Sequence, residues 1–286
     1  MRLIDEAMRA AASASDADVD RSTLHAPLVA ETLALDDGPG LRVIRPAGAV
    51  RGVMLYFHGG GFVFGDAAMH DQWGSELARR LDLASVSVDY RLAPQHRWPA
   101  QIADAMAAAR WLVGQALALF GTQRLVVGGG SVGATLGLQC LLRARDEGLA
   151  DAFCGADLVA GNYDLSGTPS QRAATDAQFL NPERLAETRR AGFPGRDGAG
   201  LRDPAISALY ADLSGLPPMH LTVGQNDAVV DDSVLLAARL ETAGVACELT
   251  LAPGADHLFL MEGGPLADEA RARAVQFLDR CLQAGA

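Results

Sequence analysis

Lysine is absent from this chain of 286 residues, so arginine supplies all 24 of its basic side chains. Without a lysine amine the protein cannot form a Schiff base with pyridoxal phosphate. It also lacks the lysine of a Walker phosphate-binding loop and the Ser-x-x-Lys dyad of β-lactamases. These three classes of active site are therefore excluded.

Cysteine is scarce as well. The chain has four cysteines, which are far apart in the sequence and lack the C-x-x-C spacing of zinc or redox sites: Cys140, Cys154, Cys247 and Cys281. We expect free thiols in a reducing compartment and no metal site. Residues 1–20 carry charges throughout and contain no apolar run, so we expect no signal peptide and a cytoplasmic location.

The charge balance is acidic, with 35 acidic residues and a net charge of −11. This disfavours binding to a nucleic-acid backbone. The uncharged run from Leu125 to Leu142 is long enough to cross a membrane, but its five glycines and its Ser, Thr and Gln are typical of a protein core. Hydrophobic residues make up 49% of the chain, enough for one large α/β domain with a small addition, or for two small domains.

The most informative segment, from Arg124 to Leu142, has the sequence RLVVGGGSVGATLGLQCLL. Its β-branched apolar start predicts a buried parallel strand, and helical spacing follows the glycines. A strand that turns into a helix through Gly-x-Ser-x-Gly, here Gly129, Ser131 and Gly133, is the nucleophile elbow of α/β-hydrolases. The neighbours must be small because the serine backbone is strained, and the helix directs its amide N–H groups toward the serine.

The same glycines allow two other interpretations. Gly128, Gly130 and Gly133 also match G-x-G-x-x-G, the dinucleotide-binding fingerprint, and Asp151 lies roughly where an acid would bind the ribose. The third interpretation is a glycine-rich turn with a solvated serine. This segment alone leaves all three open.

A second glycine-rich stretch lies upstream, where the apolar run 53–57 predicts a strand that ends in His58-Gly59-Gly60-Gly61-Phe62. Three glycines leave the backbone N–H groups bare, so that a ligand can approach them closely. Such a loop supplies two N–H donors to an oxyanion hole, and the residue after the nucleophile, Val132, supplies a third.

The rest of the chain alternates between short apolar runs and segments with helical spacing. This alternation predicts a mostly parallel sheet covered by helices on both faces. Residues 163–210 break the pattern, being polar and rich in Pro and Gly with short helical pieces around 182–190, which indicates an insertion over a binding site. The expected strands are 41–44, 53–57, 84–88, 125–127, 157–160, 220–223 and 247–251, and the expected helices are 69–81, 98–118, 132–147, 232–243 and 265–282.

A serine nucleophile needs a base to take its proton and an acid to orient that base. In α/β-hydrolases the acid and then the base follow the serine, each just beyond the end of a strand. Only His220 and His257 follow Ser131 in the chain. His220 lies inside an apolar strand, whereas His257 follows the last strand. His257 is therefore the expected base.

Asp227 lies in the loop directly after the strand 220–223 and is the expected acid. Asp231 and Asp232 come later and are expected to cap the next helix. The dinucleotide interpretation gives no role to the His-Gly-Gly-Gly loop or to His257. The pattern as a whole therefore favours a serine hydrolase.

Six stretches resemble the bacterial hormone-sensitive-lipase family of carboxylesterases, also termed family IV or the α/β hydrolase-3 group. They are YFHGGGF, DYRLAPQHRWPA, GGSVG, PAISALYADLSGLPP, TVGQNDAVVDDS and PGADHLF, and they extend from Tyr56 to Phe259. The resemblance implies an α/β-hydrolase fold with a mostly parallel eight-stranded sheet and a small helical cap. The cap would combine an N-terminal segment, 1–40, with an insertion at about 163–210 in a catalytic domain spanning 41–286.

The resemblance also assigns roles by motif position. Ser131 corresponds to the nucleophile, Asp227 to the acid and His257 to the base, while the N–H groups of Gly60, Gly61 and Val132 form the oxyanion hole. Further residues near these motifs are expected to contact the substrate: His58, Gly59, Phe62, Asn162, Tyr163 and Leu258.

Two residues depart from the family pattern. Gly130 stands where an aspartate is usual before the serine, and Gln95 stands where a glutamate is usual after Ala-Pro. Because charge is missing at both places, we expect an aspartate introduced at Gly130 to be buried without partners and to lower both stability and turnover.

The sequence therefore predicts a serine carboxylesterase that hydrolyses small uncharged acyl esters, with no cofactor and no metal. Its expected partner is a small-molecule ester, with neither nucleic acid nor membrane, and a homodimer is left open. Two alternatives stay open: an amidase or formamidase with the same triad, and a catalytically weak ligand-binding protein of the same fold.

Overall fold

Eight strands form one sheet in the order β1-β2-β4-β3-β5-β6-β7-β8 in the computed structural model, which describes residues 27–36 and 38–283. From β4 to β8 in this order, neighbouring strands pair in parallel, whereas β2 pairs antiparallel with both β1 and β4. The strands are β1 (Glu31–Ala34), β2 (Gly40–Ile44), β3 (Gly52–Phe57), β4 (Leu83–Asp89), β5 (Leu125–Gly130), β6 (Phe153–Val159), β7 (Met219–Gly224) and β8 (Cys247–Ala252).

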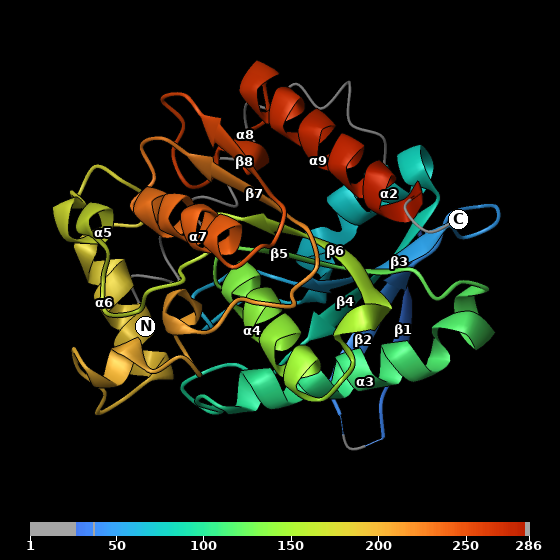
Figure 1. The fold of residues 1–286 in the computed structure, drawn as a ribbon, viewed down its shortest axis with the longest axis horizontal. Coiled ribbons are helices and arrows are strands. Elements are labelled where there is room, and N and C mark those ends of the chain that lie inside the picture. Colours follow the sequence, from blue (N-terminus) through green and yellow to red (C-terminus); the bar gives the residue numbers. More distant parts are fainter. Residues whose placement is uncertain (1–26, 37, 284–286) are drawn as a thin grey trace.

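Helices cover both faces of this sheet (Figure 1). One face carries α3 (Ala100–Phe120), α4 (Val132–Asp146) and α7 (Val230–Thr242), and the other carries α2 (Asp71–Leu81) and α9 (Pro265–Gln283). The predicted α/β-hydrolase fold, with its mostly parallel eight-stranded sheet, is confirmed.

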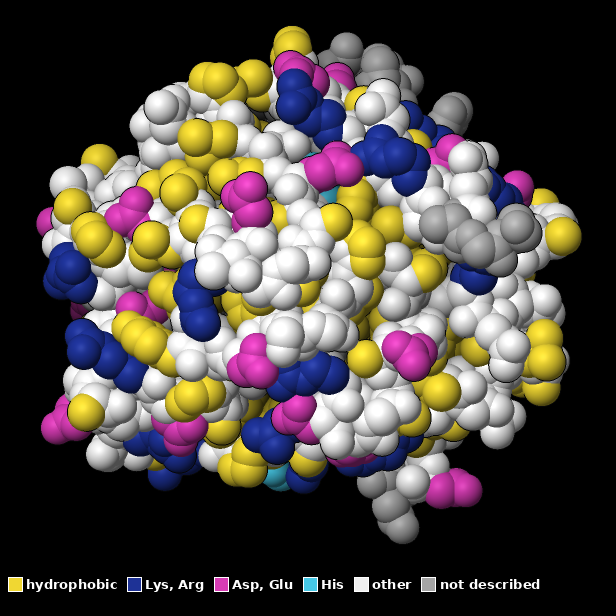
Figure 2. All heavy atoms as spheres, in the orientation of Figure 1, with side chains coloured by type: hydrophobic (Ala, Val, Ile, Leu, Met, Phe, Trp, Pro, Cys, Tyr) yellow, Lys and Arg dark blue, Asp and Glu magenta, His cyan; other side chains and the backbone are white. Residues whose placement is uncertain are grey.

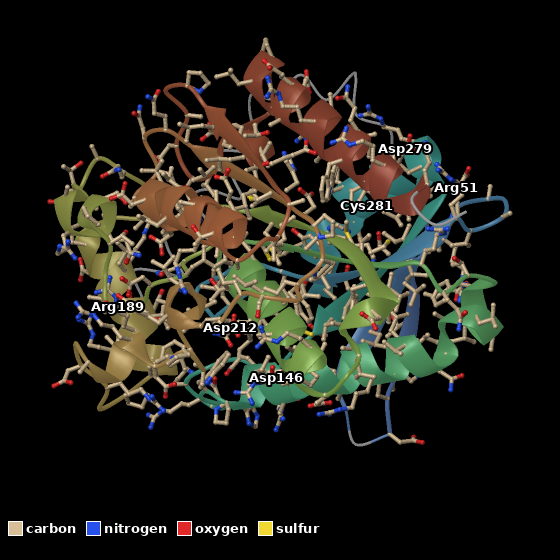
Figure 3. The ribbon with its side chains drawn as sticks, in the orientation of Figure 1. Arg51, Asp146, Arg189, Asp212, Asp279 and Cys281 are labelled. Carbon is tan, nitrogen blue, oxygen red and sulfur yellow. The ribbon has the colours of Figure 1, made fainter. Side chains whose placement is uncertain are left out.

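The hydrophobic core lies in two layers because side chains alternate along each strand. On β3, Leu55 and Phe57 pack with the α3 and α4 layer, whereas Met54 packs with the α2 and α9 layer. An ion pair at 2.9 Å between Arg51, just before β3, and Asp279 of α9 lies at the edge of the second layer (Figure 3). Both layers of the core therefore pack against β3, the strand that leads into the His-Gly-Gly-Gly loop.

The first strand lies within the segment expected to form an N-terminal cap. Residues 1–26 of that segment lie outside the described residues. Glu31–Ala34 pairs with β2, so the sheet begins before the predicted boundary at residue 40. β1 was not predicted because its side chains are mostly exposed and show no apolar alternation.

The chain leaves the sheet between β6 and β7 to form the cap insertion, residues 163–210. It contains α5 (Pro169–Ala173), α6 (Pro182–Gly192) and two short 3-10 turns. Figure 1 shows α5 and α6, in yellow, beyond one end of the sheet. Its first residues are held by Asp232 of α7, whose carboxylate accepts hydrogen bonds from the N–H groups of Tyr163 and Asp164, each at 2.8 Å.

The prediction that Asp231 and Asp232 cap α7 is therefore wrong. Both lie inside the first turn of the helix, which begins after Val229 and has no side-chain cap. Their carboxylates instead reach the cap insertion, where Asp231 accepts the N–H of Ser170 at 2.7 Å. An acid in this turn still interacts favourably with the helix dipole, but its hydrogen bonds are to another segment.

Within the described residues, α3 is long and apolar enough to cross a membrane by length and composition. Here it packs against β3, β4 and α4, and residues such as Ala105, Ala109 and Leu112 have no exposed surface. This packing is that of a core helix.

Candidate active site

Ser131 lies in a tight turn between β5 and α4, with left-handed backbone angles of φ 54° and ψ −129°. Such a conformation is strained for serine and must be held by its surroundings. The chain packs so closely here that a Cβ on Gly129 would lie 2.4 Å from the Gly133 carbonyl oxygen. A Cβ on Gly133 would lie 2.1 Å from the carbonyl oxygen of Phe57. Glycine is therefore required on both sides of the serine.

Ser131, His257 and Asp227 follow three different strands and form a hydrogen-bonded line. His257 Nδ1 is 2.7 Å from Asp227 Oδ2, and His257 Nε2 is 3.0 Å from Ser131 Oγ. A carboxylate can only accept, so Nδ1 carries the hydrogen of a neutral imidazole. Nε2 is then free to accept the hydroxyl hydrogen of Ser131. This is the arrangement in which a histidine can take a proton from a serine.

Asp227 and His257 are both shielded from water: Asp227 is 1% exposed and His257 is 9% exposed. Burial by itself lowers the pKa of His257. The charge of Asp227, its hydrogen bond and the charge of Asp256 outweigh burial, so the pKa of His257 lies above its ordinary value. The surroundings therefore favour the imidazolium that forms when the base takes a proton.

The His-Gly-Gly-Gly loop lies against Ser131. A Cβ on Gly59 would lie 3.4 Å from the Ser131 Cβ, and Gly60 and Gly61 have left-handed φ angles of 110° and 62°. Within the described residues, the amide hydrogens of Gly60, Gly61 and Val132 take part in none of the backbone hydrogen bonds of loops, turns and helix ends. These N–H groups can therefore donate to an oxyanion beside Ser131.

His58 and Tyr90 pack against this loop and support its backbone. Their rings stack with centroids 4.1 Å apart, and the Tyr90 hydroxyl donates to the His58 carbonyl oxygen at 2.7 Å. His58 Nδ1 donates to the carbonyl oxygen of Gly59, also at 2.7 Å. Because burial lowers the pKa of His58, this histidine stays neutral and acts as a support for the glycine backbone.

The cap insertion contacts both the His-Gly-Gly-Gly loop and His257. A Cβ on Gly61 would lie 2.9 Å from the Thr188 hydroxyl oxygen, and the Phe193 ring lies 6.1 Å from that of Phe62. Phe179 stacks on the His257 ring with a centroid separation of 5.8 Å and an angle of 7° between the planes. The sequence predicts an insertion over a binding site, with Phe179 and Phe193 among its residues, but it does not specify these contacts, because they join segments far apart in the chain.

Of the six residues expected to contact a substrate, four are buried: His58, Phe62, Asn162 and Tyr163. Tyr163 has no exposed surface, and its ring packs against Gly161, so it has no surface that a substrate could contact. Asn162 is 7% exposed and accepts a hydrogen bond from Gln171. Gly59 and Leu258 are half-buried.

The other candidate base, His220, is placed where it cannot serve Ser131. Its Nδ1 is 2.8 Å from Asp157 and its Nε2 is 2.9 Å from the Thr250 hydroxyl oxygen. The ring stacks on Phe277 of α9 and is 1% exposed. Both nitrogens are thus engaged within the sheet and its covering helix.

A cysteine nucleophile and a metal centre find no support in the described residues. Burial raises the pKa of Cys140 and of Cys281 to about 12, and that of Cys247 to about 11, so these thiols stay protonated at neutral pH. No group of three or more His, Cys, Asp or Glu side chains within the described ranges is arranged to hold a metal ion.

Comparison with known proteins matches this chain to one family. A family described as having the alpha/beta hydrolase fold matches residues 54–261. The esterase LipI of Mycobacterium tuberculosis is 34% identical over 273 residues, covering 90% of this chain and 84% of that protein. The ethyl acetate hydrolase of Pseudomonas putida is 33% identical over 239 residues, covering 80% of this chain and 73% of that protein.

Solved structures agree with the sequence relatives. The thermostable carboxylesterase EstE1, cloned from a metagenomic library, superposes with a TM-score of 0.85 at 27% identity, covering 98% of this chain and 97% of that one. A hormone-sensitive lipase from a metagenome library gives a TM-score of 0.80 at 31% identity, covering 90% and 86%. The fold of this chain is thus shared with solved structures of a carboxylesterase and a hormone-sensitive lipase.

Proposed function

Because this chain belongs to the α/β-hydrolase family of esterases related to hormone-sensitive lipase, and is an ester-hydrolysing enzyme, we propose that it is a serine carboxylesterase with a Ser131-His257-Asp227 triad. The observation that carries the proposal is the hydrogen-bonded line from Asp227 through His257 to Ser131 beside the glycine loop. The order of these residues in the chain is also that of the α/β-hydrolases.

In the first half of the reaction, Ser131 Oγ attacks the ester carbonyl carbon while His257 Nε2 takes its proton. Asp227 stabilises the imidazolium and keeps the ring oriented. The oxyanion is held by the N–H groups of Gly60, Gly61 and Val132. The imidazolium then gives its proton to the alkoxy oxygen as the carbon–oxygen bond breaks, which releases the alcohol and leaves an acyl ester on Ser131.

In the second half, a water molecule replaces the alcohol. His257 takes a proton from this water as its oxygen attacks the acyl carbon, and the same N–H groups hold the second oxyanion. The imidazolium then returns a proton to Ser131 Oγ as the acyl–serine bond breaks. A carboxylic acid leaves, and the free serine is restored.

The proposed substrates are esters with small, uncharged acyl groups. One support is the relative named an ethyl acetate hydrolase. Another is the aromatic cluster where the cap insertion meets the oxyanion loop, in which the rings of Phe62, Trp98 and Phe193 lie about 6 Å apart. This apolar cluster behind the loop favours an apolar acyl group, and we propose that the cap insertion limits its length.

Covalent labelling tests the nucleophile. A fluorophosphonate probe should label the protein at a single serine, and the Ser131→Ala variant should take up no label, because only an activated serine reacts with such a probe. Mass spectrometry of the labelled peptide identifies the site. Labelling elsewhere, or equal labelling of Ser131→Ala, would contradict the proposal.

Turnover of p-nitrophenyl esters tests the other two members. His257→Ala should lower kcat by about 10⁴–10⁶-fold and Asp227→Asn by about 10⁴-fold, with residual activity from the oxyanion hole. The matched control is His220→Asn, which changes a buried histidine outside the proposed triad and should keep kcat within about threefold while the protein is folded. Near-normal turnover in His257→Ala would show that the base is another residue.

A further inference from the structure

The short stretch Gln178–Phe179 of the cap insertion joins the two loops that carry the acid and the base. The Gln178 side-chain amide donates to the carbonyl oxygen of Asn226 at 2.7 Å, next to Asp227. The Phe179 N–H donates to Asp256 Oδ2 at 3.1 Å, next to His257. One dipeptide of the insertion is therefore fastened to both loops.

Asp256 couples the insertion to the base. One of its carboxylate oxygens accepts the Phe179 N–H, and the other accepts the backbone N–H of His257 at 2.7 Å. A single rigid carboxylate thus sets the distance between the two backbones. Because both bonds have an ionised acceptor, they are stronger than ordinary hydrogen bonds.

Phe179 then lies with its ring parallel to the imidazole, 5.8 Å between centroids and 7° between planes. The ring is held in turn by Arg184 of α6, whose guanidinium carbon lies 4.5 Å from the ring centroid. Arg184 also donates to the Phe179 carbonyl oxygen at 2.6 Å. Both the backbone and the ring of Phe179 are therefore fixed before any substrate arrives.

We propose that Phe179 is a positioning residue for His257: the cap insertion holds the imidazole plane in line with Ser131 through this stack. The proposal rests on the proposed function and extends it, because it makes the insertion part of the proton-transfer geometry as well as a cover for the acyl group. Misplacement of a reacting group by about 1 Å can cost about 10²-fold in rate. The parallel stacking of Phe179 on the base is therefore a point at which small displacements affect the rate.

The first experiment does not need activity. In the Ser131→Ala background, NMR of the histidine side chains should show the His257 Hε1 resonance shifted by the aromatic ring current of Phe179. Phe179→Leu should remove that shift, and Phe179→Tyr should keep it. A second variant, Asp256→Ala, leaves the ring in the chain but removes its fastening, and should also diminish the shift. A His257 resonance that is the same in all four proteins would overturn the proposal.

The second experiment measures kcat and KM with p-nitrophenyl acetate, whose acyl group is too small to need a long pocket. Phe179→Leu should lower kcat by about tenfold with KM within about twofold, and Phe179→Tyr should restore kcat. The control is Leu185→Ala, a buried residue of α6, which loosens the same insertion and should change the melting temperature more than kcat. Equal kcat for the Leu and Tyr variants would mean that Phe179 only lines the pocket.

The two hypotheses fail differently. If the parent protein hydrolyses no ester and Ser131 takes up no fluorophosphonate, the proposed function is wrong, and the NMR comparison still decides whether Phe179 stacks on His257. If the parent is active but the Phe179 variants match it in both experiments, only the positioning role is wrong.

Discussion

At the scale of single residues, the glycines around Ser131 are not equivalent. A Cβ on Gly133 meets backbone atoms that cannot move aside, whereas a Cβ on Gly130 would have only the Tyr56 hydroxyl oxygen, at 3.4 Å, among described atoms within 4 Å. Gly130 is also half-buried and not fully enclosed. The sequence-based reason for expecting an aspartate here to be destabilising, a carboxylate without partners, therefore does not fit the surroundings.

Gly130→Asp is a direct test of this revised view. Because the Tyr56 hydroxyl can donate to the new carboxylate, we expect the free energy of unfolding to change by less than about 1 kcal/mol. A negative charge next to Ser131 should raise the pKa of His257 and move the acidic limb of kcat/KM to higher pH. Urea unfolding and a pH–rate profile measure the two effects.

The control is Gly130→Asn, which has nearly the same shape without the charge and should leave the pH profile where it is in the parent. A loss of several kcal/mol in the Asp variant alone would restore the original expectation that the carboxylate is buried without a partner.

The three residues of the hydrogen-bonded line were predictable because each obeys a rule of chain order and strand ends. Phe179 was expected only as a residue of the insertion over the pocket, and its stack on His257 was not predictable, since 78 residues separate the two and no pattern relates them. Asp232 was misjudged for a related reason. An acid just before a helix satisfies the capping pattern, and only the fold shows that its carboxylate serves another segment.

At the scale of elements, buried strands were the most predictable. Seven of the eight were expected from apolar runs, although β6 begins at Phe153 and was expected only from Asp157, because Gly155 and Cys154 interrupt the apolar pattern. The eighth, β1, lies at the sheet edge and has few buried side chains. The two helices of the cap insertion are short and polar, so the local sequence only weakly defines them.

The attachment of the cap insertion to α7 depends on a carboxylate in the core. Asp232 is fully buried, and its Oδ2 accepts hydrogen bonds from Thr168 and Gln171, each at 2.8 Å. Burial raises the pKa of Asp232 from 3.8 to about 7, against the hydrogen bonds, which lower it. Near neutral pH this anchor therefore changes its protonation state in the folded protein.

Asp232→Asn should reveal the resulting pH dependence of stability. The unfolded chain loses this proton near pH 3.8, whereas the folded protein keeps it until about pH 7. Between these values the folded state binds more protons, so the free energy of unfolding falls as the pH rises and is level above pH 7. The asparagine cannot titrate and mimics the protonated acid. Urea unfolding at pH 5 and pH 8 should show the parent losing stability relative to the variant.

Asp231→Asn is the matched control, because this neighbour also bonds to the insertion but is only half-buried. The free energy of unfolding of this variant should differ from that of the parent by about the same amount at pH 5 and at pH 8. If the Asp232 variant and the parent keep a constant difference in the free energy of unfolding, the carboxylate is ionised throughout and is held by its four hydrogen bonds.

At the scale of the whole molecule, charge is unevenly divided between the insertion and the rest. The net charge of the chain is −11, yet residues 163–210 carry six arginines and six acidic residues and are neutral as a segment. Figure 2 shows basic and acidic side chains interspersed on the visible face. The acidic excess therefore lies outside this segment, in residues 1–162 and 211–286, and the field around the protein is negative overall.

This negative field should make an anionic ester a poor substrate. We expect kcat/KM for the p-nitrophenyl monoester of succinate to be about tenfold below that for p-nitrophenyl butyrate at low salt, because long-range repulsion reduces the encounter rate. Raising the ionic strength from about 0.01 M to about 1 M shortens the screening length from about 30 Å to about 3 Å and should narrow the gap. The neutral butyrate, measured in parallel, should change little. If the difference in kcat/KM between the two esters does not change with salt, short-range contacts within the site cause the discrimination. If the anionic ester is the better substrate, local arginines such as Arg184 bind it.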